Sequence, residues 1–264
     1  MTARVVRIAE QPGGVIRLTL DRPEVHNAFD EDVIAQLAAA FAALAARADV
    51  RVVVLAAAGP TFCAGGDLNW MRRAAALGPD GNRADAVVFG GMLKALAELP
   101  QPTLALVQGN AFGGGLGLIA ACDVALAVRG ARFALTEVRL GLAPAVISPH
   151  VVAAIGARQA RRYMLTAETF DADEARRIGL VHEVVATPET LEAAAAALVG
   201  RLRANGPAAM ARTKALIRAV AGRAIDEALV AETAALIAEL RASPEGREGL
   251  AAFLGKRKPA WDET

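Results

Sequence analysis

Gln108-Gly-Asn-Ala-Phe-Gly-Gly-Gly-Leu-Gly117 is the stretch that decides the fold, and Phe62-Cys-Ala-Gly-Gly-Asp67 echoes it earlier in the chain. Each follows an apolar run typical of a buried strand, at 52–56 and 103–107, and each precedes a segment with helical character. Glycine at a strand-to-helix turn exposes backbone N–H donors to a reacting group. Two such turns predict a pair of N–H groups that converge on one developing negative charge, as in an oxyanion hole.

The composition favours a large apolar core and excludes a broad nucleic-acid surface. The chain has 264 residues, enough for one large domain or one and a half. Hydrophobic residues make up 55% but aromatic residues only 4%, so alanine, leucine and valine must fill the core. The 29 lysines and arginines balance 28 acidic residues, which gives no wide basic field.

The cysteines and the N-terminus indicate a cytoplasmic protein. Cys63 and Cys122 are far apart and lack metal-ligand spacing, which argues against a disulfide framework and favours a reducing compartment. Residues 1–10 have no apolar signal-peptide region, and polar residues and glycines interrupt the apolar stretch 104–128. We therefore expect neither a membrane span nor a metal site.

Strands and helices alternate along most of the chain, which predicts an α/β core. We expect a flexible surface loop at 77–82, because this segment combines Gly78, Pro79 and Gly81 with polar residues. The expected strands are 4–9, 15–20, 50–56, 103–107, 123–128 and 180–185. The expected helices are 30–46, 85–99, the segment after the glycine run, 158–166, 172–178, 191–204, 207–221, 225–241 and 245–254. We divide the chain into a core of residues 1–200 and a helical region of residues 201–264.

The glycine turns admit alternative interpretations. Glycines 113–115 could serve tight strand–helix packing alone, whereas a nucleotide cradle is disfavoured because no Gly-Lys-Ser/Thr follows. Asp67 is expected to cap the next helix, and Cys63 to be a small packing residue. The three histidines share no spacing with serine or cysteine, so we expect surface or packing roles for them.

Glu137 is the candidate acid–base residue. It lies among apolar residues, where a carboxyl group has a raised proton affinity and can exchange protons with a substrate. An ion pair with Arg132 or Arg139 is an equally good interpretation from residue type alone.

These motifs, in this order, resemble the crotonase superfamily, the enoyl-CoA hydratase/isomerase family. The resemblance covers nearly the whole chain. The segments that carry it are Leu20-Asp-Arg-Pro-Glu-Val-His-Asn-Ala28, the two glycine turns through Leu68 and Asp123, Phe133-Ala-Leu-Thr-Glu137 and Ala251-Ala-Phe-Leu-Gly-Lys-Arg-Lys-Pro259.

The resemblance implies a fold and a substrate class. The expected fold is an α/β spiral of ββα repeats followed by a C-terminal helical region used in trimerisation, and such trimers commonly pair into hexamers. The expected substrate is an acyl-CoA thioester, with no separate cofactor because coenzyme A belongs to the substrate. By position, the N–H groups of Gly66 and Gly114 hold the thioester oxygen. The coenzyme A groove is lined by Val25, Ala64 and Leu68, and Lys256 and Lys258 approach its phosphates, sometimes from a neighbouring subunit.

Gly117 departs from the family pattern. Hydratases of this family use two glutamates, of which the second falls on Glu137 and the first falls on Gly117, which has no side chain. A single glutamate at the second position is typical of Δ3,Δ2-enoyl-CoA isomerases. The segments Asp67-Leu-Asn-Trp-Met71 and 141–156, however, resemble the methylglutaconyl-CoA hydratase branch, which serves leucine and acyclic-terpene breakdown.

Three hypotheses follow from these residues. The first is a lyase that reversibly hydrates a 2-enoyl-CoA, of methylglutaconyl or another branched type. The second is an isomerase that uses Glu137 alone as a proton shuttle. The third is an acyl-CoA-binding protein that kept the fold and lost catalysis.

Overall fold

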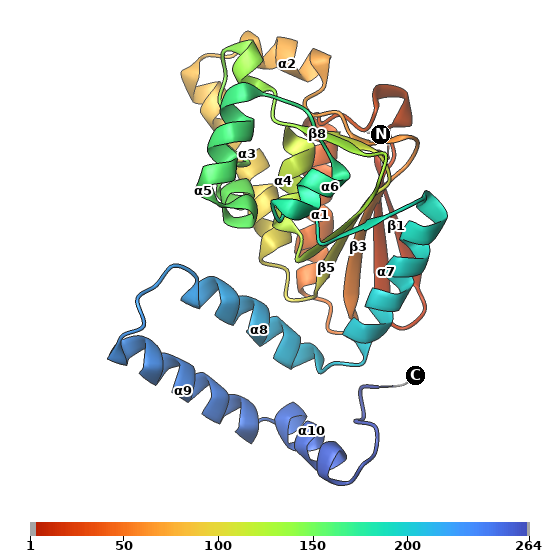
Figure 1. Cartoon of the computed structure of the whole chain (residues 1–264), viewed down its shortest axis with the longest axis vertical. Helices are drawn as coiled ribbons and strands as arrows, with labels where there is room; N and C mark the ends of the chain where they lie inside the picture. The colour runs from red at the N-terminus through yellow and green to blue at the C-terminus, as the bar shows by residue number, and fades with distance from the viewer. Residues whose placement is uncertain (1–3, 263–264) are drawn as a thin grey trace.

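Two β-sheets share the core, and the strands from β3 to β8 alternate between them along the chain (Figure 1). The structure is a computed structural model that describes residues 4–262. The larger sheet has the order β1 (Val6–Gln11), β2 (Val15–Leu20), β3 (Val52–Ala57), β5 (Thr103–Val107), β7 (Val124–Val128) and β10 (Glu183–Val185). The smaller sheet has the order β4 (Thr61–Cys63), β6 (Asn110–Phe112), β8 (Arg132–Ala134) and β9 (Phe170–Asp171).

The strand order confirms the spiral of ββα repeats. Strands β3, β5 and β7 run parallel in the larger sheet, and the strand that follows each of them, β4, β6 and β8, runs parallel in the smaller sheet. Each repeat therefore adds one strand to each sheet before the chain turns into a helix. The continuous apolar runs at 52–56 and 103–107 are buried, as expected for strands covered on both faces.

Helices cover both faces of the larger sheet. Helix α7 (Pro188–Arg203) contacts β3, β5 and β7, while α1, α3, α4 and α5 gather on the opposite side in Figure 1. The bounds of the remaining core helices are α1 Glu31–Ala45, α2 Leu68–Ala75, α3 Pro79–Ala97, α4 Gly114–Ala121, α5 Ser148–Thr166 and α6 Ala172–Arg177, with short 3-10 turns η1 Pro23–Val25 and η2 Glu137–Leu140. None of the helices within 4–262 is long and apolar enough to cross a membrane.

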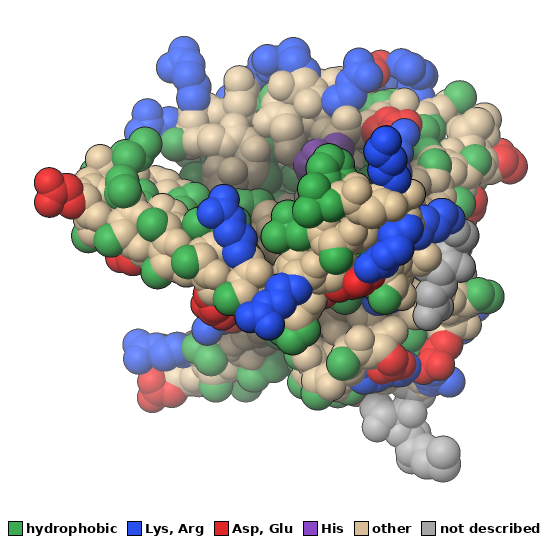
Figure 2. Space-filling model, turned by 90° about the horizontal axis from the view of Figure 1, so that it is seen from below, with side chains coloured by type: hydrophobic (Ala, Val, Ile, Leu, Met, Phe, Trp, Pro, Cys, Tyr) green, Lys and Arg blue, Asp and Glu red, His purple; other side chains and the backbone are tan. Residues whose placement is uncertain are grey.

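The C-terminal helices extend away from the core. Helices α8 (Pro207–Val220), α9 (Glu227–Ala242) and α10 (Pro244–Leu254) lie at the bottom of Figure 1, at the far end of the long axis from α2. Figure 2 views the molecule from this end and shows hydrophobic side chains between charged ones. Large apolar side chains here are exposed, among them Ile217, Ile225, Val230, Phe253 and Leu254. A single chain thus leaves part of the apolar surface of this region uncovered.

The prediction of a flexible surface loop at 77–82 is wrong. Residues from Pro79 onward belong to α3, so the helix begins six residues before the predicted start at 85. Gly78 is the extended N-cap, and Pro79 occupies the first turn, where its fixed φ suits a helix and its missing N–H removes no hydrogen bond. The same residues that favour a loop therefore begin a helix here. Helix α5 likewise begins at Ser148, before the predicted start at 158, and is kinked at Gly156.

A partly buried ion pair attaches α8 to the core. Lys214 Nζ lies 2.6 Å from Asp123 Oδ2 and donates to the Gln101 carbonyl over 2.8 Å. The Lys214 side chain is 9% exposed, and Asp123 Oδ2 also accepts from the N–H and hydroxyl of Thr103. Lys214 thus joins the C-terminal region to the strand ends of β5 and β7.

We predict that Lys214→Ala lowers the free energy of unfolding by about 1.5 kcal/mol, because it removes charge-assisted hydrogen bonds from a largely buried ammonium to a partly exposed carboxylate and a carbonyl. The control is Lys94→Ala, whose exposed partner Glu98 lies 3.9 Å away and whose loss should change stability by less than about 0.5 kcal/mol. Urea denaturation of both variants measures the difference. Equal effects of the two substitutions would contradict the proposed attachment.

Candidate active site

The second glycine turn brings a carboxylate to the start of α4. Gly113 has φ 48° and ψ −117°, a conformation that glycine adopts without strain, and its N–H donates to Ala134 O over 3.0 Å. A Cβ placed on Gly113 would lie 3.1 Å from Glu137 Oε1. The Glu137 carboxylate therefore lies directly against Gly113, beside the first N–H groups of the helix.

The first glycine turn meets the second. Phe29 pairs with Gly66 in a short parallel bridge, in which Phe29 N donates to Gly65 O and Asp67 N donates to Phe29 O, each over 2.7 Å. Gly65 has φ 93°, and its Cα lies 3.8 Å from the position of a Gly113 Cβ. The two turns are therefore in contact, and the positive φ of both glycines is a conformation that residues with a side chain rarely adopt.

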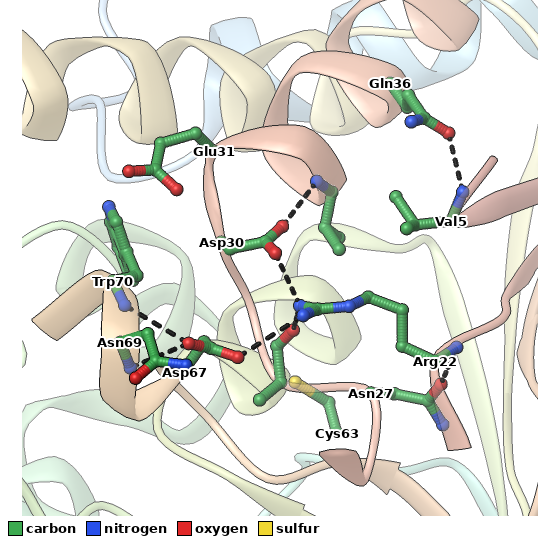
Figure 3. A network of polar contacts seen from close by, with 12 residues as sticks. Val5, Arg22, Asn27, Asp30, Glu31, Gln36, Cys63, Asp67, Asn69 and Trp70 are labelled. Atoms are coloured by element: carbon green, nitrogen blue, oxygen red, sulfur yellow. Dashed lines mark hydrogen bonds and ion pairs between the residues drawn. The ribbon is translucent and has the colours of Figure 1, made fainter. Parts of the chain in front are cut away.

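Arg22 links the first glycine turn to the start of α1 (Figure 3). Its guanidinium lies 2.8 Å from Asp30 and 3.3 Å from Asp67, and it also donates to Ala28 O. Asp67 Oδ1 accepts from the N–H groups of Asn69 and Trp70, which confirms its predicted role as the helix cap. Burial opposes ionisation of Asp67, but these two N–H groups and Arg22 outweigh it and hold the pKa of Asp67 below its ordinary value.

Asn27 anchors the same segment and was not identified from the sequence as a site residue. Its side-chain NH2 donates to the carbonyls of Ala58 and Thr61 over 2.8 Å each, and its Oδ1 accepts from Arg22 N. Asn27 is 1% exposed and has φ 54°. The signal was available in the segment Asp-Arg-Pro-Glu-Val-His-Asn, because asparagine tolerates this backbone conformation and can satisfy buried carbonyls.

The two predicted oxyanion donors are brought together by these contacts. Among residues 4–262, neither Gly66 N–H nor Gly114 N–H has a hydrogen-bond acceptor, and Gly114 is the first residue of α4, where a helix leaves its N–H groups unpaired. Apolar side chains surround both: Phe29 and Phe89 pack against Gly114, and Trp70 and Met71 against Gly66. Such surroundings strengthen a hydrogen bond to developing charge.

Glu137 is not an ion-pair partner. Arg132 lies near Asp171, and Arg139 donates to Ala167 O, so the interpretation of Glu137 as their partner is wrong. Glu137 Oε2 is shielded from solvent and has no hydrogen-bond partner among the described residues. Burial raises the pKa of Glu137 above its ordinary value. An unpartnered carboxylate of raised proton affinity is suited to accept and return protons.

Gly117 faces packed hydrocarbon rather than open space. A Cβ placed there would lie 2.5 Å from Ile147 Cγ2, 3.0 Å from Ile147 Cβ and 3.4 Å from Leu93 Cδ1. Ile147 is 3% exposed and Leu93 is fully buried. Position 117 therefore has no room for any side chain while Ile147 holds this place.

The predicted coenzyme A residues divide into two groups. Val25 ends η1, Ala64 N donates to the carbonyl of His26 over 3.0 Å, and Leu68 begins α2 with 70% of its surface exposed. These three residues thus flank the Gly66 turn. Lys256 and Lys258 follow α10, which lies at the opposite end of the molecule from α2 (Figure 1). A single copy of the protein therefore does not bring these lysines to the site.

The cysteines and histidines do not form a second reactive centre. Burial raises the pKa of both Cys63 and Cys122 to about 12, so each remains a thiol near neutral pH. No group of three His, Cys, Asp or Glu residues in the described part of the chain could hold a metal ion.

We predict that Glu137→Gln raises the melting temperature at pH 7, because it removes an unpartnered carboxylate whose charged form the fold disfavours. The folded-state pKa is raised, so this gain is full above that pKa, shrinks as the pH falls through it, and vanishes below the unfolded-state value of about 4.3. Calorimetry between pH 4 and pH 8 measures it. The exposed Glu183→Gln is the control and should show no such gain; a pH-independent effect of Glu137→Gln would contradict the prediction.

Comparison with known proteins identifies the family of this chain. The family model for enoyl-CoA hydratase/isomerase matches residues 10–264. A short-chain-enoyl-CoA hydratase of Clostridium acetobutylicum is 30% identical over 253 residues, 95% of each chain. An enoyl-CoA hydratase structure from Shewanella pealeana has 43% identity and a TM-score of 0.94, covering 98% of this chain and 96% of that one. Pseudomonas aeruginosa AtuE has 41% identity and a TM-score of 0.94, covering 98% and 100%. The chain therefore belongs to the enoyl-CoA hydratase/isomerase family of the crotonase superfamily and is an enoyl-CoA hydratase-type enzyme.

Proposed function

We propose that this enzyme hydrates a 2-enoyl-CoA with Glu137 as the only carboxylate that handles protons. The observation that carries the proposal is the position of Glu137, whose carboxylate lies against Gly113 while its Oε2 is shielded and unpartnered. The N–H groups of Gly66 and Gly114 provide the complementary half of the site, since both lack an acceptor within the described residues.

The chemistry needs a base, an acid and an oxyanion hole. The ionised Glu137 takes a proton from water as the water oxygen bonds to C3 of the enoyl group. Electrons move into the thioester carbonyl, and the N–H groups of Gly66 and Gly114 stabilise the enolate oxygen. Glu137, now protonated, returns the proton to C2. One oxyanion-hole donor contributes about 3 kcal/mol to such a transition state.

A branched, glutaconyl-type acyl group is the substrate class we propose. With a glycine at 117 and hydrocarbon packed against it, a second carboxylate for holding the water is absent from that position. A distal carboxylate on the substrate could supply this polar group. The segments 67–71 and 141–156 support the same class through their resemblance to methylglutaconyl-CoA hydratases.

Double-bond isomerisation is the second candidate. In that reaction Glu137 removes a proton from C2 of a 3-enoyl-CoA and returns it to C4, and no water is needed. The packed position 117 favours this candidate too, because a single carboxylate suffices for it.

The proposal includes an assembly of several copies. Exposed apolar residues of α8–α10 provide a surface that a homotrimer, or a hexamer of two trimers, would cover. In such an assembly Lys256 and Lys258 would reach the phosphates of a coenzyme A bound to a neighbouring copy. The site of their own copy lies at the opposite end of the molecule from α10 (Figure 1).

We predict that Glu137→Gln lowers kcat/KM for hydration by about 10²–10⁴-fold, the usual contribution of a general acid–base residue. In the wild type, kcat/KM should fall as the pH drops through the raised pKa of Glu137, so the acid limb lies above the ordinary value near 4.3. The control Glu183→Gln should keep full activity. Undiminished turnover by folded Glu137→Gln would refute the role of Glu137.

A substrate panel tests the reaction class. Crotonyl-CoA, 3-methylglutaconyl-CoA and a 3-enoyl-CoA are incubated in H2¹⁸O, and the products are analysed by mass spectrometry. We expect incorporation of one labelled water, with kcat/KM at least about 10-fold higher for the glutaconyl substrate than for crotonyl-CoA, because its distal carboxylate holds the attacking water in place of the absent second glutamate. An unlabelled isomer as the sole product would establish isomerisation instead.

A further inference from the structure

We propose that Ile147 is a specificity-determining residue, which keeps a second side chain out of the site and commits the enzyme to one-carboxylate chemistry. This inference rests on the proposed role of Glu137. The observation behind it is the packing of Ile147 into the place that a side chain at 117 would occupy.

The helix geometry places position 117 next to the proposed oxyanion donor. Gly114 and Gly117 both belong to α4 and are three residues apart, a spacing that makes residues neighbours on one helix face. Phe89 and Leu93, both from α3, lie against positions 114 and 117 respectively. A side chain at 117 would therefore project from the face of α4 that also carries Gly114.

Ile147 and Leu93 close that face with hydrocarbon. Ile147 is the residue before α5, and its Cγ2 and Cβ would lie 2.5 and 3.0 Å from a Cβ at 117. Leu93, from α3, is ordinary contact distance away, at 3.4 Å. The 2.5 Å contact with Ile147 Cγ2 is too short for any real Cβ, so Ile147 rather than Leu93 prevents a side chain at 117.

Ile147 is fixed in this position by the core. It is 3% exposed and belongs to the main hydrophobic cluster, and α4 and α5 pack against each other. Displacing it would leave a void or force neighbouring side chains out of their rotamers. The core therefore does not accommodate a side chain at 117 alone. Such a side chain requires a smaller residue at 147.

The activity test compares crotonyl-CoA hydration in matched backgrounds. We expect Gly117→Glu with Ile147→Ala to exceed Ile147→Ala alone by at least about 10-fold in kcat/KM, since an added acid–base group contributes this much or more. Gly117→Gln with Ile147→Ala, which has the same shape without the charge, should show no gain. Gly117→Glu in the presence of Ile147 should be destabilised and show no gain.

Two results would overturn the proposal. One is a folded Gly117→Glu/Ile147→Ala enzyme with no gain over Ile147→Ala, or with a gain that the glutamine variant matches. The other is an equal gain from Gly117→Glu with Ile147 intact. Failure of the proposed function can be told apart from failure of this inference. It would appear as undiminished turnover when Glu137→Gln is made in an otherwise wild-type chain.

A stability cycle provides a second test that does not need an active double variant. Gly117→Ala adds only the Cβ that Ile147 opposes, and its effect on the melting temperature is measured in the wild type, in Ile147→Ala and in Ile147→Val. We expect the substitution to lower the melting temperature with isoleucine or valine at 147, because valine keeps the γ-carbons that crowd Gly117. We expect the loss to shrink with alanine, which removes the 2.5 Å contact of Cγ2 and keeps only Cβ, and equal effects in all three backgrounds would refute the proposal.

Discussion

The close contact of the two glycine turns is the constraint on which the site depends. The Cα of Gly65 lies 3.8 Å from where a Gly113 Cβ would be, and the bridge between Phe29 and Gly66 holds the first turn at this separation. The proposed oxyanion hole needs both turns, because Gly66 belongs to one and Gly114 to the other. The sheets bring the turns together, since β4 and β6, which precede them, are parallel neighbours in the smaller sheet.

Most charged side chains near the site hold its backbone in place and are paired with one another. Arg22 pairs with both Asp30 and Asp67 beside the first turn, and Asn27 satisfies the carbonyls of Ala58 and Thr61. Glu137 is the contrast, a carboxylate without a cationic partner among the described residues and with a raised pKa. Polar groups that are fully paired rigidify the site, while the one left unpaired retains the capacity to exchange protons.

The correspondence between sequence and structure is closest where local chemistry is strong. The strand at 15–20, the Asp67 cap and the buried strands before each glycine turn follow from apolar runs and capping preferences in the printed sequence. The segment 77–82 differs because Gly78 and Pro79 are compatible with both a loop and a helix start. Local preference cannot distinguish the two, and the packing of α3 against α1 and α4 decides it.

By itself, the sequence determined the α/β class, the glycines at the two turns, the presence of Glu137 and the absence of an acid at 117. These features depend on residue identity and short-range sequence pattern, which the sequence shows directly. Only the tertiary structure decided that Glu137 lacks an arginine partner, that Arg22 and Asn27 brace the first turn, and that Ile147 fills the space beside Gly117. Each of these involves residues distant along the chain, whose contacts arise only when the packing of sheets and helices brings them within a few ångströms.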